Sequence, residues 1–260
     1  MTSWKLATID LTTYGYVTMI NDYMDFADRR GENVVIPHRH GSVFVEKYFN
    51  ERKIAFGFVV VGADSTALET AMDALRAAMA VRAQQTLEMT MNDASKRQIS
   101  VSVNESLQVE RVSDKIAKTV VNFTAASPFW HSDTVITDNT ETIDSSPHAM
   151  TVSNTGTVEE RDPTIIITGP FTSMTITNST NGAVLTYTGA IDAGETVTIG
   201  TLNGEFYATH NVDGNVIGNV THSGSSALLP IEVGDNTLAI TSAGGDDSGT
   251  VQVTFYPPFI

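Results

Sequence analysis

Apolar residues in the first half of the chain follow first a strand pattern and then a helical one. Residues 54–61 form a β-branched and aromatic run that ends at Gly62, which predicts a strand. A helix is predicted next, over residues 66–80, because apolar side chains recur there at intervals of four, three and four. These side chains are Leu68, Met72, Leu75 and Met79, with Ala71 and Ala78 beside them.

Two capping signals precede this helix, and strand-like alternation follows it. Asp64 and Ser65 are favourable N-cap residues, and Thr66 with Glu69 has the spacing of a capping box. Apolar residues then share one face of a predicted strand at positions 87, 89 and 91, and of a second at 99, 101 and 103. Val120, Val121 and Phe123 predict a last strand. One helix among strands, without regular βαβ alternation, predicts an α+β domain with an antiparallel sheet.

The second half consists of short, evenly spaced apolar runs separated by turn residues. Typical turns are Asn181-Gly182, Asn203-Gly204 and Asp213-Gly214. This pattern predicts an all-β sandwich or jelly roll of about eight to ten strands. The runs lie at residues 152, 165–167, 174–176, 184–187, 197–199, 216–217, 231–233, 238–240 and 251–255.

The two halves also differ in charge. Residues 1–130 hold 14 of the 15 basic and 15 of the 30 acidic residues, which is a net charge of -1. Residues 131–260 hold one base, Arg161, and 15 acids, which is a net charge of -14. This shift predicts a first domain at 1–130 and a second at 147–260, with the polar, turn-prone segment 131–146 as the linker between them.

Composition argues against several functional classes. The net charge of -15 disfavours binding to nucleic acid or to an anionic membrane. No apolar run approaches the ~18 residues needed to span a bilayer, and the N-terminus lacks the pattern of a signal peptide. The chain has no cysteine, and it contains no GxSxG, HExxH or GxxxxGK[ST] motif. We therefore predict no cofactor, no catalytic residue and no enzymatic activity.

Three polar clusters are candidates for metal or acid–base chemistry. His38 and His40 would share a strand face and could ligate a metal, but no third ligand has a useful spacing, which favours a polar strand edge or subunit contact. Residues 244–249 form either an oxygen-rich calcium loop or, as we favour, a solvated hairpin turn. The adjacent acids Glu159-Glu160 and Asp246-Asp247 would point to opposite strand faces, so spacing alone does not pair them.

Aromatic residues in the second half suggest one further site. Sandwich domains bind carbohydrates by stacking sugars on exposed rings, and the candidates here are Tyr187, Phe206 and Tyr207. The alternative that we favour is that Phe206 and Tyr207 lie half in the core and half at the surface. The apolar segment 256–260 is expected to dock on its own domain or on a partner.

Several segments, in order along nearly the whole chain, carry a resemblance to one protein family. The most specific is Ala125-Ala126-Ser127-Pro128-Phe129-Trp130, and residues 30–41 and 48–54 match earlier family segments. Matches in the second half lie at residues 154–156, 163–165, 176–178, 202–204, 234–238 and 256–259. In these segments the chain resembles the distal tail proteins and related minor tail proteins of phages with long, non-contractile tails.

This resemblance implies a structural role in a virion assembled in the host cytoplasm. Family members form homo-hexameric rings through the first domain, and the ring joins the tail tube protein to the tail tip, baseplate or receptor-binding proteins. The second domain is a galectin-like sandwich that projects outward. Some members carry an inserted carbohydrate-binding module, for which this chain has no room.

Three hypotheses therefore compete. The first is a structural tail hub without catalysis, which the near-neutral first half favours because a large like charge would oppose the packing of identical subunits. The second is a carbohydrate-binding adhesin, which predicts that Tyr187, Phe206 or Tyr207 lines a concave face of the sandwich. The third is a glycan hydrolase, which needs two carboxylates that face each other about 5 to 9.5 Å apart.

Overall fold

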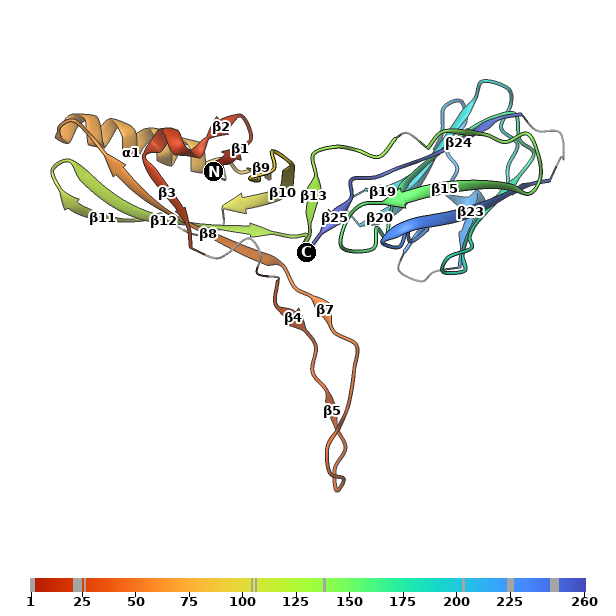
Figure 1. Cartoon of the computed structure of the whole chain (residues 1–260), viewed down its shortest axis with the longest axis horizontal. Helices are drawn as coiled ribbons and strands as arrows, with labels where there is room; N and C mark the ends of the chain where they lie inside the picture. The colour runs from red at the N-terminus through yellow and green to blue at the C-terminus, as the bar shows by residue number, and fades with distance from the viewer. Residues whose placement is uncertain are drawn as a thin grey trace. The chain divides into compact units, whose positions relative to one another are not determined.

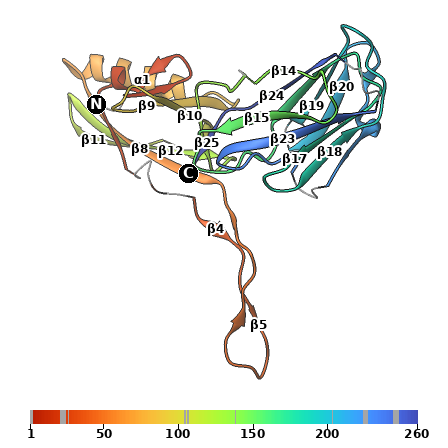
Figure 2. The same cartoon turned by 45° about the vertical axis from the view of Figure 1, so that its right-hand side comes forward.

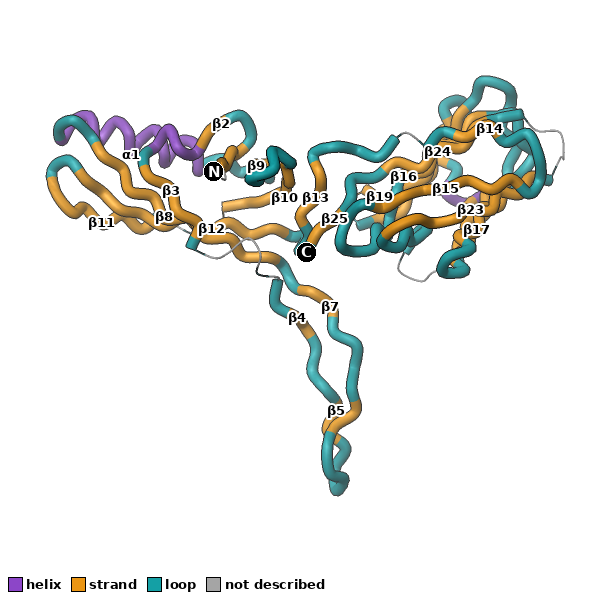
Figure 3. The backbone as a smooth tube through the Cα atoms, viewed as in Figure 1, coloured by secondary structure: helices purple, strands orange, loops and turns teal. Residues whose placement is uncertain are grey.

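We describe the chain from a computed structural model, which covers residues 3–20, 25, 27–103, 105, 107–137, 139–202, 204–223, 227–243 and 248–260. The chain divides into two compact units: unit 1 contains residues 1–130 with Ile260, and unit 2 contains residues 131–259. Strands dominate both units (Figure 3), and α1 (Ser65–Met79) is the one α-helix in these ranges. Within the same ranges, no helix has the length and apolar character that a membrane span requires.

Unit 1 is built on an antiparallel sheet with strand order β2-β1-β9-β10-β12-β8-β3, and β11 pairs with β12. The long strands β8 and β12 form its centre, with Gly57 opposite Val120 and Phe56 opposite Val121. β3 and β11 form exposed edges. The strands are β1 (Ser3–Leu6), β2 (Ile9–Asp10), β3 (Tyr16–Met19), β8 (Arg52–Val61), β9 (Gln85–Thr90), β10 (Lys96–Val103), β11 (Gln108–Ser113) and β12 (Ile116–Ala125).

Alternation along these strands places large apolar side chains on one face of the sheet. Along β8, Ile54, Phe56 and Phe58 are buried, whereas the intervening residues are more exposed. Phe56 contacts Trp4 and Phe123 edge-on, with ring centroids 5.0 and 5.8 Å apart. Unit 1 therefore has an aromatic core on one side of the sheet, and the other side of β8 and β12 is open.

Helix α1 lies in the predicted place and covers this core. Of the two N-terminal capping signals that the sequence offered, one is confirmed and the other is wrong. The Asp64 side chain accepts a hydrogen bond from the Ala67 backbone N–H at 2.8 Å, which makes Asp64 the N-cap. The capping box of Thr66 and Glu69 is wrong, because both residues lie inside the helix and Glu69 pairs with Arg111 at 3.5 Å. The predicted apolar stripe is confirmed: Leu68, Met72, Leu75 and Met79 are all buried.

Unit 2 consists mainly of two antiparallel sheets. The six-stranded sheet has the order β14-β24-β16-β19-β20-β21 and the five-stranded sheet the order β15-β23-β17-β18-β22. Their strands are β14 (Glu141–Thr142), β15 (His148–Asn154), β16 (Thr164–Thr168), β17 (Met174–Asn178), β18 (Ala183–Tyr187), β19 (Thr196–Leu202), β20 (Glu205–His210), β21 (Gly214–Asn215), β22 (Val220–His222), β23 (Gly234–Ser242) and β24 (Thr250–Thr254).

Both sheets bury alternate residues in one continuous hydrophobic core. Val152, Ile176 and Ile240 from the five-stranded sheet and Ile165 and Val253 from the six-stranded sheet belong to it, and none exceeds 1% exposure. Threonines occupy many of the alternate outward positions, in keeping with strands that have one wet face. Unit 2 therefore encloses its apolar residues between its own layers.

The segment 131–146 is not the linker that its polar composition predicted. Ile136 forms an isolated antiparallel β-bridge with Phe255, and β14 pairs with β24. Ile143 is 1% exposed and belongs to the unit 2 core. Two spaced isoleucines supply enough burial to hold an otherwise polar segment against the sheet. The C-terminal segment also docks on unit 2: Ser132 of β13 (Trp130–Ser132) donates its N–H to the Pro257 carbonyl, one residue before β25 (Pro258–Phe259).

Candidate assembly surface

A β-hairpin, residues 28–50, extends from unit 1 and is named here the arm. Two short ladders hold it together: β4 (Arg29–Arg30) pairs with β7 (Tyr48–Phe49), and β5 (Val34–Val35) pairs with β6 (Ser42–Val43). Figures 1 and 2 show that the arm leads away from the unit 1 sheet in both views.

The arm carries large apolar side chains that the described residues of unit 1 leave exposed. Phe44 is 74% exposed and Val35 71%, and the exposed set also includes Val34, Ile36, Val43, Val45 and Tyr48. A two-stranded hairpin by itself is marginally stable at best in water, and large contiguous apolar patches mark interaction sites. The arm therefore has the properties of an element that is completed by a further surface.

Aromatic and cationic contacts fix the base of the arm to unit 1. Phe49 contacts Phe129 edge-on with ring centroids 5.7 Å apart, and the Arg29 guanidinium lies 5.1 Å from the centre of the Phe49 ring. The Pro-Phe-Trp sequence that ends unit 1 thus forms part of the base on which the arm stands.

Arg52, the first residue of β8, completes this base. It is 4% exposed, and its guanidinium donates hydrogen bonds to the backbone carbonyls of Pro128, at 3.1 Å, and of Asp25. It also lies 5.8 Å from the centre of the Trp130 ring. Burial lowers the pKa of Arg52, but a guanidinium stays charged in proteins. A buried cation with fixed partners is costly to displace, so Arg52 holds the start of β8, the strand that follows the arm, against the end of unit 1.

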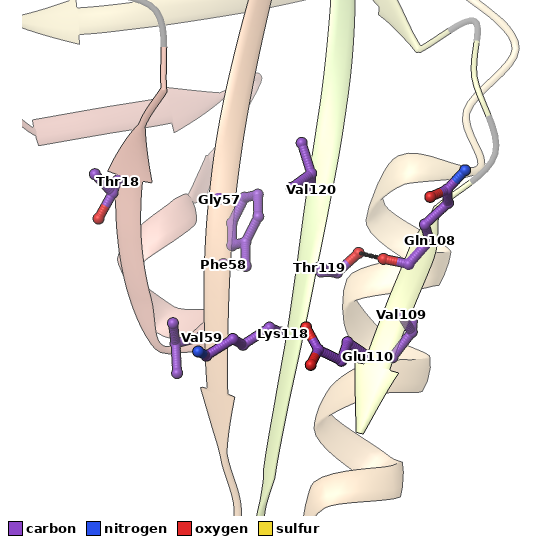
Figure 4. Close-up of a pocket in the computed structure, with 10 residues that line it drawn as sticks. All are labelled: Thr18, Gly57, Phe58, Val59, Gln108, Val109, Glu110, Lys118, Thr119 and Val120. Carbon is purple, nitrogen blue, oxygen red and sulfur yellow. Dashed lines mark hydrogen bonds between the residues drawn. The ribbon is translucent and has the colours of Figure 1, made fainter. Parts of the chain in front are cut away.

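The open face of the unit 1 sheet contains a groove of about 580 Å³ over β3, β8, β12 and β11. Figure 4 shows Gly57 and Val59 of β8 between Thr18 and Lys118, with Glu110 on the far side. The largest exposed apolar residues of this face are Tyr16, Ile20, Val61, Val112 and Val120. The groove lining thus combines apolar side chains with one cation, Lys118, and one anion, Glu110.

Gly57 at the floor of the groove is not required by the packing of unit 1. A Cβ atom at this position would meet the Ile20 side chain at 3.7 Å, which is an ordinary contact, and the backbone is not in the left-handed region. The missing side chain nevertheless leaves space at the centre of the sheet, where another chain can approach closely.

The metal-site candidates are not completed by the described part of the chain. His38 and His40 are exposed near the tip of the arm, where the positive φ of His38 (62°) shapes the turn. Across the described ranges, no group of three histidine, aspartate or glutamate side chains is placed to hold a metal ion. In the calcium-loop candidate, residues 244–247, including Asp246 and Asp247, lie outside the described residues.

The three carbohydrate candidates do not come together on one surface. Tyr187 is 3% exposed in the core of unit 2, and Phe206 packs against the same core and contacts His222 edge-on at 4.8 Å. Tyr207 follows Phe206 on β20 and points to the opposite face, where it lies over Gly200 of β19. Phe206 and Tyr207 are both partly buried, but only Phe206 packs against the core, and Tyr187 is buried.

Glu159 and Glu160 also have separate environments. Glu159 pairs with Arg161 at 3.5 Å, whereas Glu160 accepts a hydrogen bond from the Asp162 backbone N–H at 2.9 Å. Burial raises the pKa of Glu160, and the nearby charge of Asp162 acts in the same direction. Glu159 and Glu160 therefore do not form an acid–base couple with each other.

Sequence reasoning missed the arm and its anchor Arg52. A signal for the arm was present: two β-branched and aromatic runs, 34–36 and 43–45, flank a Pro37…Gly41 turn, which is a hairpin pattern. The burial of Arg52 leaves no comparable signal, because arginine at a strand start is ordinarily exposed.

No protein-family model and no curated protein sequence matches the chain. Among solved structures, the Dit protein (gp 19.1) of phage SPP1, described as a paradigm of the hub adsorption apparatus in phages that infect Gram-positive bacteria, is similar over 98% of this chain and 99% of its own length. The TM-score is 0.68 and the sequence identity 14%. The two proteins therefore share a fold across both units.

Two structures of the phage P2 baseplate in its activated conformation are more distantly similar. The structure with calcium and the one with strontium each align over 98% of this chain at 10% identity, with TM-scores of 0.48 and 0.49, and each alignment covers 98% of the matched chain.

Proposed function

We propose that this protein is a structural component of a phage tail, a distal tail hub that forms a closed ring of identical subunits through unit 1. The main support is the likeness of fold to SPP1 Dit, which extends over the whole of both chains. The uncovered apolar arm and the open sheet face of unit 1 agree with this role, because a ring subunit presents surfaces that its neighbours cover.

In this proposal the ring is hexameric and joins the tail tube protein to the tail tip, baseplate or receptor-binding proteins. Unit 2, as a galectin-like sandwich with a net charge of -14, is the peripheral unit that contacts these other tail parts. The protein acts without catalysis or cofactor, binds no nucleic acid, is assembled in the host cytoplasm and resides in the virion.

The carbohydrate-binding alternative has less support. It predicts that Tyr187, Phe206 or Tyr207 lines a concave face of the sandwich, and of these three Tyr187 is buried and Phe206 belongs partly to the core. Tyr207 alone remains as a predicted contact. A single ring over a glycine is also explained by packing across the two strands, since an aromatic side chain fills the space that glycine leaves.

The proposed function is tested by the oligomeric state of the full chain. Light scattering after size exclusion should give a mass that is an integral multiple of the 28.0 kDa subunit, and negative-stain microscopy should show rings with a central hole. A strict monomer at every concentration would contradict the proposal.

A further inference from the structure

We infer that His210 in unit 2 is a pH-sensitive switch, which holds the turn between β20 and β21 in one arrangement when neutral and in another when protonated. The switch belongs to a single subunit, so it does not depend on the proposed ring. It rests on the two ring nitrogens of one buried side chain and on the backbone and carboxylate groups that compete for them.

His210 is the last residue of β20 and lies at the end of the hairpin that β20 forms with β21. Its side chain is 2% exposed, and its Nδ1 atom accepts hydrogen bonds from the backbone N–H groups of Val212, at 3.3 Å, and of Asp213, at 3.1 Å. An imidazole nitrogen accepts a hydrogen bond only when it carries no proton. This arrangement of the turn therefore requires the neutral ring, with its proton on Nε2.

Two carboxylates face the imidazole of His210, one at each nitrogen. Nε2 lies 3.4 Å from Oε2 of Glu195, an atom that accepts the Asp192 backbone N–H at 3.2 Å. Nδ1 lies 3.7 Å from Oδ2 of Asp213, whose side chain is 71% exposed. The residues that pair with His210 on the neighbouring strands carry no charge: Val197 on β19 and Gly214 on β21.

Protonation reverses the role of Nδ1. A proton taken up from solvent turns this atom into a donor, so the N–H groups of Val212 and Asp213 lose their acceptor. The Asp213 carboxylate, which is already 3.7 Å away, is then the acceptor that Nδ1 meets. To make this bond, the turn has to rotate its N–H groups away from the ring and its exposed carboxylate towards it.

The charge of the protonated ring is compensated where it forms. An isolated buried cation is strongly disfavoured, but an imidazolium between Glu195 and Asp213 has an anion at each nitrogen. Histidine is also the side chain whose charge ordinarily changes between about pH 5 and about pH 8. The two arrangements therefore exchange within that range, and the turn that contains Val212, which is 65% exposed, is the element that responds.

Hydrogen–deuterium exchange of the full chain tests the switch. It is read by mass spectrometry with fragmentation at about pH 7.5 and about pH 5.5, with exchange times scaled for the intrinsic rate. We expect the protection of the Val212 and Asp213 amides to fall at least ~10-fold at the lower pH, because each loses its hydrogen bond. Amides of the core strand β24 should keep their protection. Unchanged protection of the turn, or an equal loss in β24, would overturn the inference.

His210→Asn separates protonation of this ring from other effects of acid. The asparagine Oδ1 takes the place of Nδ1 and accepts from the same N–H groups, as in an Asx-turn, but it does not titrate. Its turn should stay protected at both pH values. The control is His148→Asn, which changes a histidine paired with Asp144 and should behave as the wild type does. A loss of protection in His210→Asn as large as in the wild type would refute the switch.

Asp213→Asn tests the second arrangement and leaves the histidine in place. Removing one of the two anions disfavours the protonated ring, so the loss of protection should move to a lower pH. A midpoint equal to that of the wild type would contradict the inference. These measurements do not require the ring: a monomeric chain would contradict the proposed function, and the same exchange experiment would still decide whether the switch exists.

Discussion

Unit 1 and unit 2 treat their apolar residues in different ways. Unit 2 encloses a continuous core between two sheets, and its most exposed apolar residues, Leu202, Val212 and Val233, are scattered over separate elements. Unit 1 buries one face of its sheet but leaves apolar residues in two groups, on the arm and on the open sheet face. Grouped exposure of this kind indicates an interface, whereas single exposed residues are normal.

The distribution of charge supports the same division. Residues 1–130 carry 14 basic and 15 acidic residues. Identical copies of unit 1 can therefore pack together without strong electrostatic repulsion. The acids of unit 2 would oppose close packing of that unit with its own copies. The comparison thus supports the proposal that unit 1 self-associates and that unit 2 stays apart from other copies.

The largest expected effect tests whether the two units are stable independently. Trp130→Ala removes a fully buried ring that contacts Trp4 and Arg52 in unit 1, at an expected cost of about 3–5 kcal/mol in the free energy of unfolding. Phe255→Ala removes a buried ring from unit 2. Differential scanning calorimetry should show that each variant lowers a different transition. A common shift of both transitions would show that the units unfold together.

The second prediction sharpens the contrast between grouped and scattered apolar residues. Phe44→Ser on the arm should weaken self-association at least ~10-fold, because burial of a phenylalanine contributes about 1.5–3 kcal/mol. Leu202→Ser in unit 2 changes a residue of similar exposure, 66% against 74%, and should leave the association constant unchanged. Sedimentation velocity over a concentration series measures both. Equal effects of the two changes would remove the distinction between the units.

Much of the fold was predictable from residue spacing. The intervals between Leu68, Met72, Leu75 and Met79 identified α1, since a buried stripe must recur with the helical period. The segment 131–146 was predicted to be a linker because most of its residues are polar and typical of turns. The two isoleucines within it, Ile136 and Ile143, were given too little weight. These two side chains help to pack the segment, and their partners, Phe255 and the unit 2 core, are remote in sequence.

The assembly surface was less predictable. Patterns of apolar residues along a sequence predict contacts within one chain, whereas the apolar side chains of the arm stay exposed in the described structure. The pattern of Val34-Val35-Ile36 is that of a buried strand, although Val35 is 71% exposed. Aromatic candidates such as Tyr187 were ambiguous for the converse reason: sequence gives the residue type but not the face of the sheet on which it lies.

A smaller effect is expected at the start of α1, the helix that covers the unit 1 core. Asp64→Ala removes the side chain that accepts a hydrogen bond from Ala67 and should cost about 1 kcal/mol, with a loss of a few degrees in the Tm of unit 1. Asp73→Ala is the control, since Asp73 is exposed and only pairs with Arg76 at 2.8 Å. Calorimetry should show no change in the unit 2 transition for either variant. If Asp73→Ala destabilises unit 1 as much as Asp64→Ala, the capping role is refuted.

The smallest expected effect concerns pH and is confined to unit 2. Burial raises the pKa of Glu160, so its ionised form is disfavoured in the folded state. The resulting cost to stability is present above the raised pKa and disappears as the pH falls below the ordinary value of 4.5. Glu160→Gln removes the charge but keeps an oxygen that can accept the Asp162 hydrogen bond.

This variant should therefore raise the Tm of unit 2 slightly near neutral pH, and the gain should vanish as the medium becomes acidic. Calorimetry between about pH 4 and about pH 8 measures the difference from wild type. Glu159→Gln is the matched control, because Glu159 is half-exposed and paired with Arg161, and its replacement should give no gain. A gain from Glu160→Gln that does not depend on pH would mean that it arises from packing rather than from the buried charge. A shift in the unit 1 transition would contradict the independence of the two units.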